Sequence, residues 1–319
     1  MREKNKAPEA PIGIIASLSA GLDTVIQGWW IILFPLSLDL FLWLGPHLSI
    51  RSVAESALTN LAILMGDNPL IDLLREAAGE LNYFSILSVT PLGVPSLISL
   101  KLPQGTPLGL PTVFLVDSEW LWLALFLGLS LGGLLVGGVY LGLIGQQVRD
   151  KAFSLPRLLA ILPRYWASVL LMIVMLLLIG IMLTLPIMAV ATLLAAWSDW
   201  LATLLVWLGF MFFLWLLYHL FFTVHGILVN EQSLPVAALT SLRLVSFNSF
   251  STMGLVTLAL SISTGLNYLW MLPKGDSWML LVGIVGHALI SSGLIAATFV
   301  YYQDRHRHWQ ELQAYLKSA

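Results

Sequence analysis

The stretch LGLSLGGLLVGGVYLGLIG, residues 127 to 145, holds no charged residue and repeats glycine at four-residue intervals. Because each helical residue rises about 1.5 Å, roughly 20 such residues cross a hydrocarbon core about 30 Å thick. Glycines four residues apart let helix backbones approach closely in a membrane, where packing drives helix association. The stretch therefore predicts a membrane-spanning helix at the centre of a bundle. Its expected packing residues are Gly133, Gly137, Gly138 and Gly142.

The composition of the whole chain agrees with this prediction. Of 319 residues, 58% are hydrophobic and 10% are charged, whereas soluble domains carry about 25% charged residues. Six apolar stretches are long enough to span a bilayer: residues 24–44, 119–145, 166–195, 200–229, 250–271 and 278–302. We predict an all-α, polytopic membrane protein in which residues 1–319 form one integral membrane domain with six transmembrane helices.

Basic residues set the expected orientation, because Lys and Arg gather on the cytoplasmic side of membrane proteins. With six spans both termini share one side, and that side holds eleven of the fifteen Lys and Arg residues. These are Arg2, Lys4, Lys6, Arg149, Lys151, Arg157, Arg164, Arg243, Arg305, Arg307 and Lys317. The sequence predicts a multi-pass protein of the plasma membrane with both termini in the cytoplasm. The first span starts late and lacks a cleavage pattern, so we expect an uncleaved anchor.

Two segments of the sequence are alike at an offset of 79 residues: SLPRLLAILPR at 154–164 and SLPVAALTSLR at 233–243. In each, the serine can cap a helix and the proline suits its first turn. We expect two weakly amphipathic helices at the cytoplasmic membrane interface, the first stopped or kinked by Pro163. Arg164 and Arg243 close the two copies near lipid phosphates. A membrane-entry device is favoured over a partner-docking or lipid-sensing surface.

The carboxy-terminal tail extends this basic interface. In DRHRHW, residues 304–309, Arg305 and Arg307 alternate with two histidines. Alternating basic residues just inside a membrane are more typical of contacts with anionic headgroups than of metal chelation. The expected partner is the lipid bilayer, with other membrane proteins as a second candidate. We expect no metal and no cofactor.

Residues 45–118 form an expected extracytoplasmic loop that is too long for a simple connector. Apolar residues at helical spacing predict short amphipathic helices, one of them starting at Asn68 and Pro69. Residues 90–111 are apolar but carry five prolines, which exclude a continuous helix or a central strand. We expect an extended cap over the outer membrane face or the mouth of the bundle. A lipid-facing cover is favoured over a lid above a site.

Ionisable residues inside a membrane are costly, so each is a candidate functional residue. Asp39 lies in the outer half of the first expected span. The other members of this candidate polar cluster, at a similar expected depth, are Asn267, Tyr268 and His287. An Asp-His pair there could relay protons or bind a cation or polar headgroup. The favoured interpretation is a buried interhelical hydrogen bond that fixes packing.

Motifs of enzymes find little support in the sequence. GLSLG at 128–132 matches Gly-x-Ser-x-Gly, but that motif requires a strand-to-helix turn rather than a continuous apolar helix. The chain has no His-Glu-x-x-His motif, no phosphate-binding glycine loop and no cysteine. A net charge of −2 gives no nucleic-acid signature. We expect no catalytic residues and no nucleic-acid partner, although enzymatic activity stays open.

The segment VNEQSLPVAALTSLRLV, residues 229–245, resembles the signature of a bacterial family of six-span membrane proteins. This family is similar to the membrane domain of some glycerophosphodiester phosphodiesterases and to YciC-like proteins. The matching positions are Glu231, Ala238, Leu239, Ser241 and Leu244. The ending ATFVYYQDRHRHW is also similar to the close of that family. The resemblance implies a six-span fold in a bacterial inner membrane, without the phosphodiesterase barrel, which would need roughly 200 more soluble residues.

Taken together, these features predict a non-catalytic integral membrane protein. Its expected role is in membrane or envelope homeostasis, or as a subunit of a membrane complex. The alternative is a transporter of a small solute or lipid that uses the polar cluster in the outer half of the bundle. A lipid-modifying enzyme is the third hypothesis.

Overall fold

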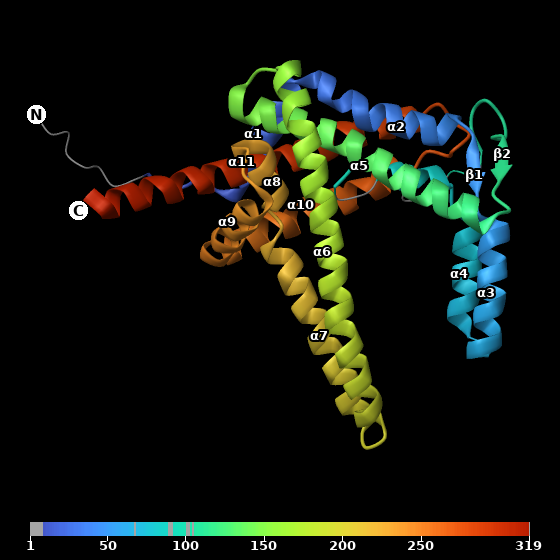
Figure 1. Cartoon of the computed structure of the whole chain (residues 1–319). Helices are drawn as coiled ribbons and strands as arrows, with labels where there is room; N and C mark the ends of the chain where they lie inside the picture. The colour runs from blue at the N-terminus through green and yellow to red at the C-terminus, as the bar shows by residue number, and fades with distance from the viewer. Residues whose placement is uncertain (1–8, 67, 89–91, 100–102, 104, 319) are drawn as a thin grey trace, which may run out of the picture.

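The computed structural model describes residues 9–66, 68–88, 92–99, 103 and 105–318, and is almost entirely helical (Figure 1). Arg2, Lys4, Lys6 and Pro91, which carry predictions above, lie outside the described residues. Five described helical segments are long and apolar enough to span a membrane, which indicates a membrane-embedded protein. They are α5 (Glu119–Asp150), α6 (Leu155–Ala195), α7 (Asp199–His219) with α8 (Thr223–Asn230), α10 (Ser249–Trp270) and α11 (Leu280–Ser318).

The first expected span has a different shape from the one predicted. Helix α1 (Ile14–Gln27) is followed by a 3-10 turn, η1 (Trp29–Ile32), and by α2 (Leu33–Leu44), and the chain bends there by 90°. The bent pair makes a sixth span only if it crosses the membrane as one broken unit. The expected bounds of 24–44 are therefore corrected, because α1 begins ten residues earlier, at Ile14, and the straight part after the bend is short.

Small residues allow α1 to pack closely along α11. A Cβ atom on Gly21 would overlap the backbone of Gly293 and Ala297, and one on Gly293 would overlap the side chain of Leu22. Gly293 and Ala297 are four residues apart, as are Gly21 and the buried Ser17. Such small-residue pairs are the usual means by which membrane helices bring their backbones together.

Both copies of the Ser-Leu-Pro repeat begin helices, α6 at Leu155 and α9 (Leu234–Phe247), each with proline in its first turn. The preceding serines occupy the N-cap positions but form no capping hydrogen bond. Helix α9 is separate and ends at Phe247, whereas α6 runs without a break through Pro163 and is 41 residues long. Of the two outcomes expected of Pro163, a stop or a kink, the stop is therefore wrong. Prolines are tolerated in membrane helices because neighbouring groups and local adjustments satisfy the freed backbone.

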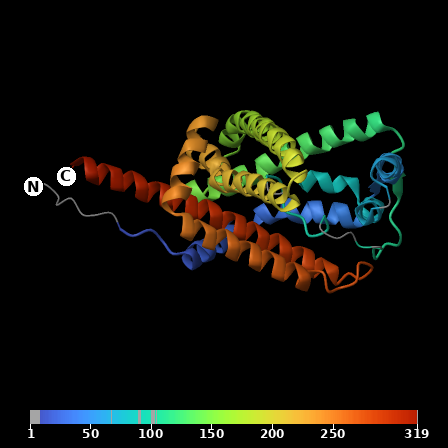
Figure 2. The same ribbon diagram turned by 90° about the horizontal axis from the view of Figure 1, so that it is seen from below.

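Helices α2, α5, α10 and α11 form the body of the molecule, and the α6–α7 hairpin leaves this body at a steep angle (Figures 1 and 2). Helices α6 and α7 pack mainly against each other. The described ends of the chain lie together at one end of the body, here named the terminal end. The opposite, loop end carries the connection between α2 and α5.

The loop end contains two helices, α3 (Arg51–Met65) and α4 (Pro69–Glu80). Asn68 caps α4 as expected, because its side chain accepts a hydrogen bond from the backbone N–H of Leu70. A 3-10 segment, η2 (Tyr83–Ser88), follows. Strands β1 (His47–Ser49) and β2 (Val113–Leu115) form a parallel pair that the sequence analysis did not predict. In the proline-rich segment, Leu97 and Ile98 are buried against Leu42 and Trp43 of α2.

Candidate functional site

The carboxylate of Asp39 in α2 binds the proline-rich segment of the loop. Asp39 is wholly buried. Its Oδ1 accepts hydrogen bonds from the Ser96 hydroxyl at 2.5 Å and from the Ile98 backbone N–H at 3.1 Å. Its Oδ2 accepts one from the Leu97 backbone N–H at 3.1 Å. A buried carboxylate is costly unless such donors satisfy it, so this contact is an anchor between the loop and the body.

The structure brings together two of the four residues of the expected polar cluster. His287 in α11 is buried, and its Nδ1 lies 3.5 Å from Oδ2 of Asp39. Asn267 and Tyr268 lie on α10, where Tyr268 is 77% exposed. Among the described residues, no hydrogen bond joins Asn267 or Tyr268 to Asp39 or His287.

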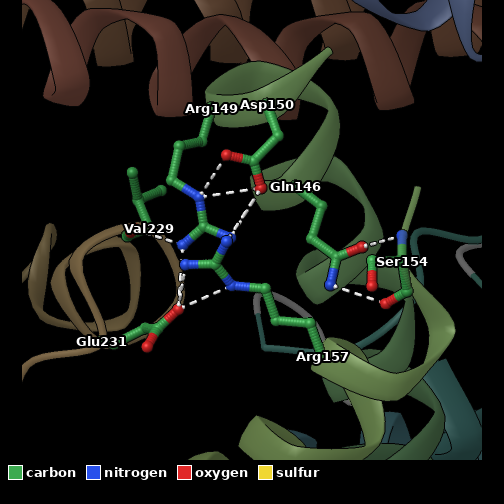
Figure 3. A network of polar contacts seen from close by, with 7 residues as sticks. All are labelled: Gln146, Arg149, Asp150, Ser154, Arg157, Val229 and Glu231. Carbon is green, nitrogen blue, oxygen red and sulfur yellow. Dashed lines mark hydrogen bonds and ion pairs between the residues drawn. The ribbon is translucent and has the colours of Figure 1, made fainter. Parts of the chain in front are cut away.

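A second polar centre joins the two copies of the repeat at the terminal end (Figure 3). The Arg157 guanidinium, in the first turn of α6, donates to Oε1 of Glu231 at 2.6 and 2.9 Å. Arg149 at the end of α5 donates to the same carboxylate at 3.2 Å and to the backbone oxygen of Val229 at 2.9 Å. Arg149 also pairs with Asp150 at 2.8 Å. Two arginines thus connect the ends of α5 and α8 with the start of α6.

The backbone of the two copies is also alike. Lys151 ends α5 and Glu231 ends α8, and both adopt left-handed conformations, with φ of 52° and 53°. Such a residue commonly terminates a helix. Each copy of the repeat is therefore a helix end, a left-handed residue, and a new helix that starts at Ser-Leu-Pro. In the first copy, Gln146 strengthens the turn by exchanging two hydrogen bonds with the backbone of Ser154.

The charge of Glu231 is stabilised by this network. The hydrogen bond from Arg157 lowers the pKa of Glu231 below its ordinary value, and the charges of Arg157 and Arg149 add to this effect against the opposing effect of partial burial. The Glu231 side chain is 43% exposed, and that of Arg157 is 49% exposed. The network is therefore a partly hydrated structural contact, whose chemistry is to hold helix ends together.

Three of the four expected packing glycines of α5 lie close to the loop or to α6. A Cβ atom on Gly137 would come within 2.5 Å of Gly93 in the loop. One on Gly138 would come within 2.6 Å of the Tyr165 ring, and one on Gly142 within 2.6 Å of the Leu158 side chain, both in α6. Gly133 is also buried. Helix α5 therefore packs closely against both α6 and the loop.

The expected interface arginines divide into two groups. Arg164, Arg243 and Arg307 are exposed. Arg305 is 6% exposed, and it donates to the backbone oxygen of Ile12 at 2.9 Å and pairs with Asp304 at 3.2 Å. Arg305 therefore ties α11 to the residues that precede α1, a role that its position in a basic tail did not indicate.

Sequence reasoning also missed the surroundings of His225 in α8. This residue is buried among the rings of Phe222, Phe299 and Tyr302, and its Nε2 lies 2.8 Å from the hydroxyl of Thr298. The run of aromatic residues in α11 was the sequence feature that could have indicated this buried environment of His225. Within the described part of the chain, no three His, Asp or Glu side chains gather as metal ligands would. Comparison of the chain with protein-family models, curated proteins and solved structures finds no match.

Proposed function

We propose that this chain is a non-catalytic integral membrane protein of the plasma membrane, with both termini in the cytoplasm. In this proposal it acts as a subunit of a membrane complex or in membrane and envelope homeostasis. The bacterial six-span family that residues 229–245 resemble is part of the same proposal. The observation that carries it is the apolar surface of the α6–α7 hairpin, which the rest of the described chain leaves largely uncovered.

One face of α7 has the character of a protein interface. Large apolar residues recur on it at helical spacing, and all are exposed: Trp200, Leu204, Trp207, Met211 and Trp215. Aromatic residues and Met are enriched in protein interfaces relative to other surfaces. Because lipid tails are as apolar as these side chains, a partner helix gains from close packing rather than from the hydrophobic effect. We assign this face to an apolar helix of another membrane protein.

The polar centre of the body supports a non-catalytic role. The oxygens of Asp39 are already occupied by three donors of the same chain. A groove of about 460 Å³ lies beside α2. Apart from Ser37 its lining residues are apolar, among them Phe34 and Leu38, and Asp39 does not line it. Transport through the polar cluster stays a prediction that no observation here favours, because the carboxylate would first have to release the loop.

Photocrosslinking in the native membrane tests the proposal. A photoreactive phenylalanine analogue replaces Trp207 on α7, and the same analogue replaces Met253, an exposed residue of α10, as the control. We expect a discrete protein adduct from position 207 and only lipid adducts from position 253. Lipid adducts alone from position 207 would contradict the subunit role, since the α7 face would then be covered by bilayer and not by a partner.

A further inference from the structure

A recess lies at the terminal end of the molecule, between α9 and the part of α11 that continues beyond the apolar span. Its cavity volume is about 20 Å³, room for about one water-sized group, and the rest of the recess is open to solvent. The lining residues that can bind a ligand by charge, hydrogen bond or ring contact are Thr240, Arg243, Asn248, Arg305, His306 and Trp309. No acidic side chain lines the recess, which suits an anionic ligand.

Arg243 contributes an uncompensated positive charge to this recess. Its side chain is exposed and forms no ion pair and no hydrogen bond with any residue that the structure describes. Arg305 differs, because Asp304 already pairs with it. The recess therefore carries about one net positive charge, which matches the single negative charge of a phosphodiester.

Two buried N–H groups in the same recess have no acceptor. Arg305 is 6% and His306 is 9% exposed, and neither Nε of Arg305 nor Nδ1 of His306 has a hydrogen-bond partner among the described residues. The other ring nitrogen of His306 lies 3.0 Å from the amide nitrogen of Gln310. When that nitrogen accepts from the amide, the ring proton resides on Nδ1. A buried donor costs free energy until an acceptor such as water or an oxyanion satisfies it, and an oxyanion forms the stronger, charge-assisted bond.

The position of the recess along α11 points to a lipid rather than to a soluble anion. The apolar part of α11 ends at Tyr302, and Arg305 follows three residues later, about 4.5 Å along the helix. Phe247 and Phe250, at the junction of α9 and α10, are 76% and 97% exposed. Exposed aromatic side chains beside basic residues are typical of helices that lie at the headgroup level of a bilayer.

We propose that this recess binds the phosphate group of an anionic glycerophospholipid. Arg243 supplies the neutralising charge at the open side of the recess. One phosphate oxygen enters the cavity and, after small side-chain rotations, accepts from Nε of Arg305 and Nδ1 of His306. The hydroxyl of Thr240 and the amide of Asn248 supply further donors. The site goes beyond the proposed role of the α6–α7 hairpin and is independent of it, because the two lie on different elements.

The test is lipid titration of the full chain in non-ionic detergent, with native mass spectrometry as the readout. Phosphatidylglycerol is compared with phosphatidylcholine for the wild type and for Arg243→Gln. The control is Arg164→Gln, which removes an exposed arginine of α6 outside the recess. We expect the wild type to hold one phosphatidylglycerol in preference to phosphatidylcholine. Loss of a charge-assisted hydrogen bond weakens that binding roughly tenfold or more in Arg243→Gln, and Arg164→Gln leaves it unchanged.

Arg243 is exposed and unpaired in the described chain, so we expect its variant to keep the unfolding temperature of the wild type. Equal weakening by both variants would show a general effect of surface charge and would overturn the site. The absence of any preference for phosphatidylglycerol would overturn it as well. Displacement of the bound lipid by millimolar inorganic phosphate would overturn the lipid assignment in favour of a free anion.

Discussion

Asp39 shows how hydrogen-bond donors of the same chain can satisfy a single carboxylate in an apolar bundle. Its two oxygens accept one hydroxyl and two backbone donors, all from residues 96–98. Without the Asp39 carboxylate, these three donors would be buried among apolar side chains, including those of Leu97 and Ile98, and would lack acceptors. The carboxylate and the loop therefore satisfy each other, and Nδ1 of His287 in α11 lies 3.5 Å from Oδ2 of the same carboxylate.

Substitution of Asp39 tests this anchor. We expect Asp39→Ala to lower stability by on the order of 3 kcal/mol, because it leaves buried donors unsatisfied. Asp39→Asn retains one carbonyl oxygen, so its effect is smaller. Hydrogen exchange at the amides of Leu97 and Ile98 is the measurement, and we expect it to accelerate most in Asp39→Ala. Asp23→Ala, at an exposed position of α1, is the control; unchanged exchange at both amides in Asp39→Ala would refute the anchor.

At the level of elements, the helix ends of the repeat are held together by charge in addition to apolar packing. Arg157 in α6 and Glu231 after α8 are separated by 74 residues in the sequence, yet they lie 2.6 Å apart. Arg149 of α5 reaches the same carboxylate. The long apolar helices are thereby connected at a polar end, where a misplaced helix would leave charges without partners.

This contact predicts a pH-dependent stability. The pKa of Glu231 is lowered in the folded state, so its stabilising effect is present above the unfolded value, about 4.3, and is lost as pH falls through the lower folded value. At pH 7 we expect Glu231→Gln to lower the unfolding temperature in detergent slightly. The side chains are about half exposed, so the effect is about 1 kcal/mol or less.

The difference between Glu231→Gln and the wild type should shrink as the pH is lowered through the folded pKa of Glu231. Asp72→Asn is a matched control, because Asp72 is an exposed carboxylate that pairs with Arg75 within the single helix α4. This substitution removes an ion pair that lies within one helix, so it reports the loss of a surface ion pair that does not join two helices. A constant difference between Glu231→Gln and wild type across this pH range would contradict the assigned role of the charge.

For the whole molecule, the bent α1–α2 unit decides whether the amino-terminal residues and the loop end lie on opposite sides of the membrane. If it crosses as one broken span, six crossings place the terminal end and the loop end on opposite sides of the bilayer. The chain has no cysteine, so single cysteines report position without background. Glu9→Cys, which precedes α1 at the terminal end, and Arg75→Cys at the loop end are suitable, because both residues are exposed and only the bent α1–α2 unit separates them.

Labelling by a membrane-impermeant maleimide in inverted and right-side-out vesicles is the measurement. We expect Glu9→Cys to react only in inverted vesicles and Arg75→Cys only in right-side-out vesicles. Reaction of both in the same vesicles would show that the two ends share one side, and would exclude the six-span arrangement with cytoplasmic termini. Neither cysteine substitution removes a Lys or Arg from the terminal end, so the basic residues that set the orientation there stay in place.

The sequence by itself determined that the chain is a helical membrane protein, because apolar length is a local property that each segment carries alone. It also determined the start of α4 at Asn68, the helix starts of the repeat, and the close-packing surface offered by the glycines of α5. Only the tertiary structure decided how these parts meet. The bend between α1 and α2, the uninterrupted α6 beyond Pro163, and the contact of Glu231 with two arginines depend on partners distant in sequence, which no local pattern specifies.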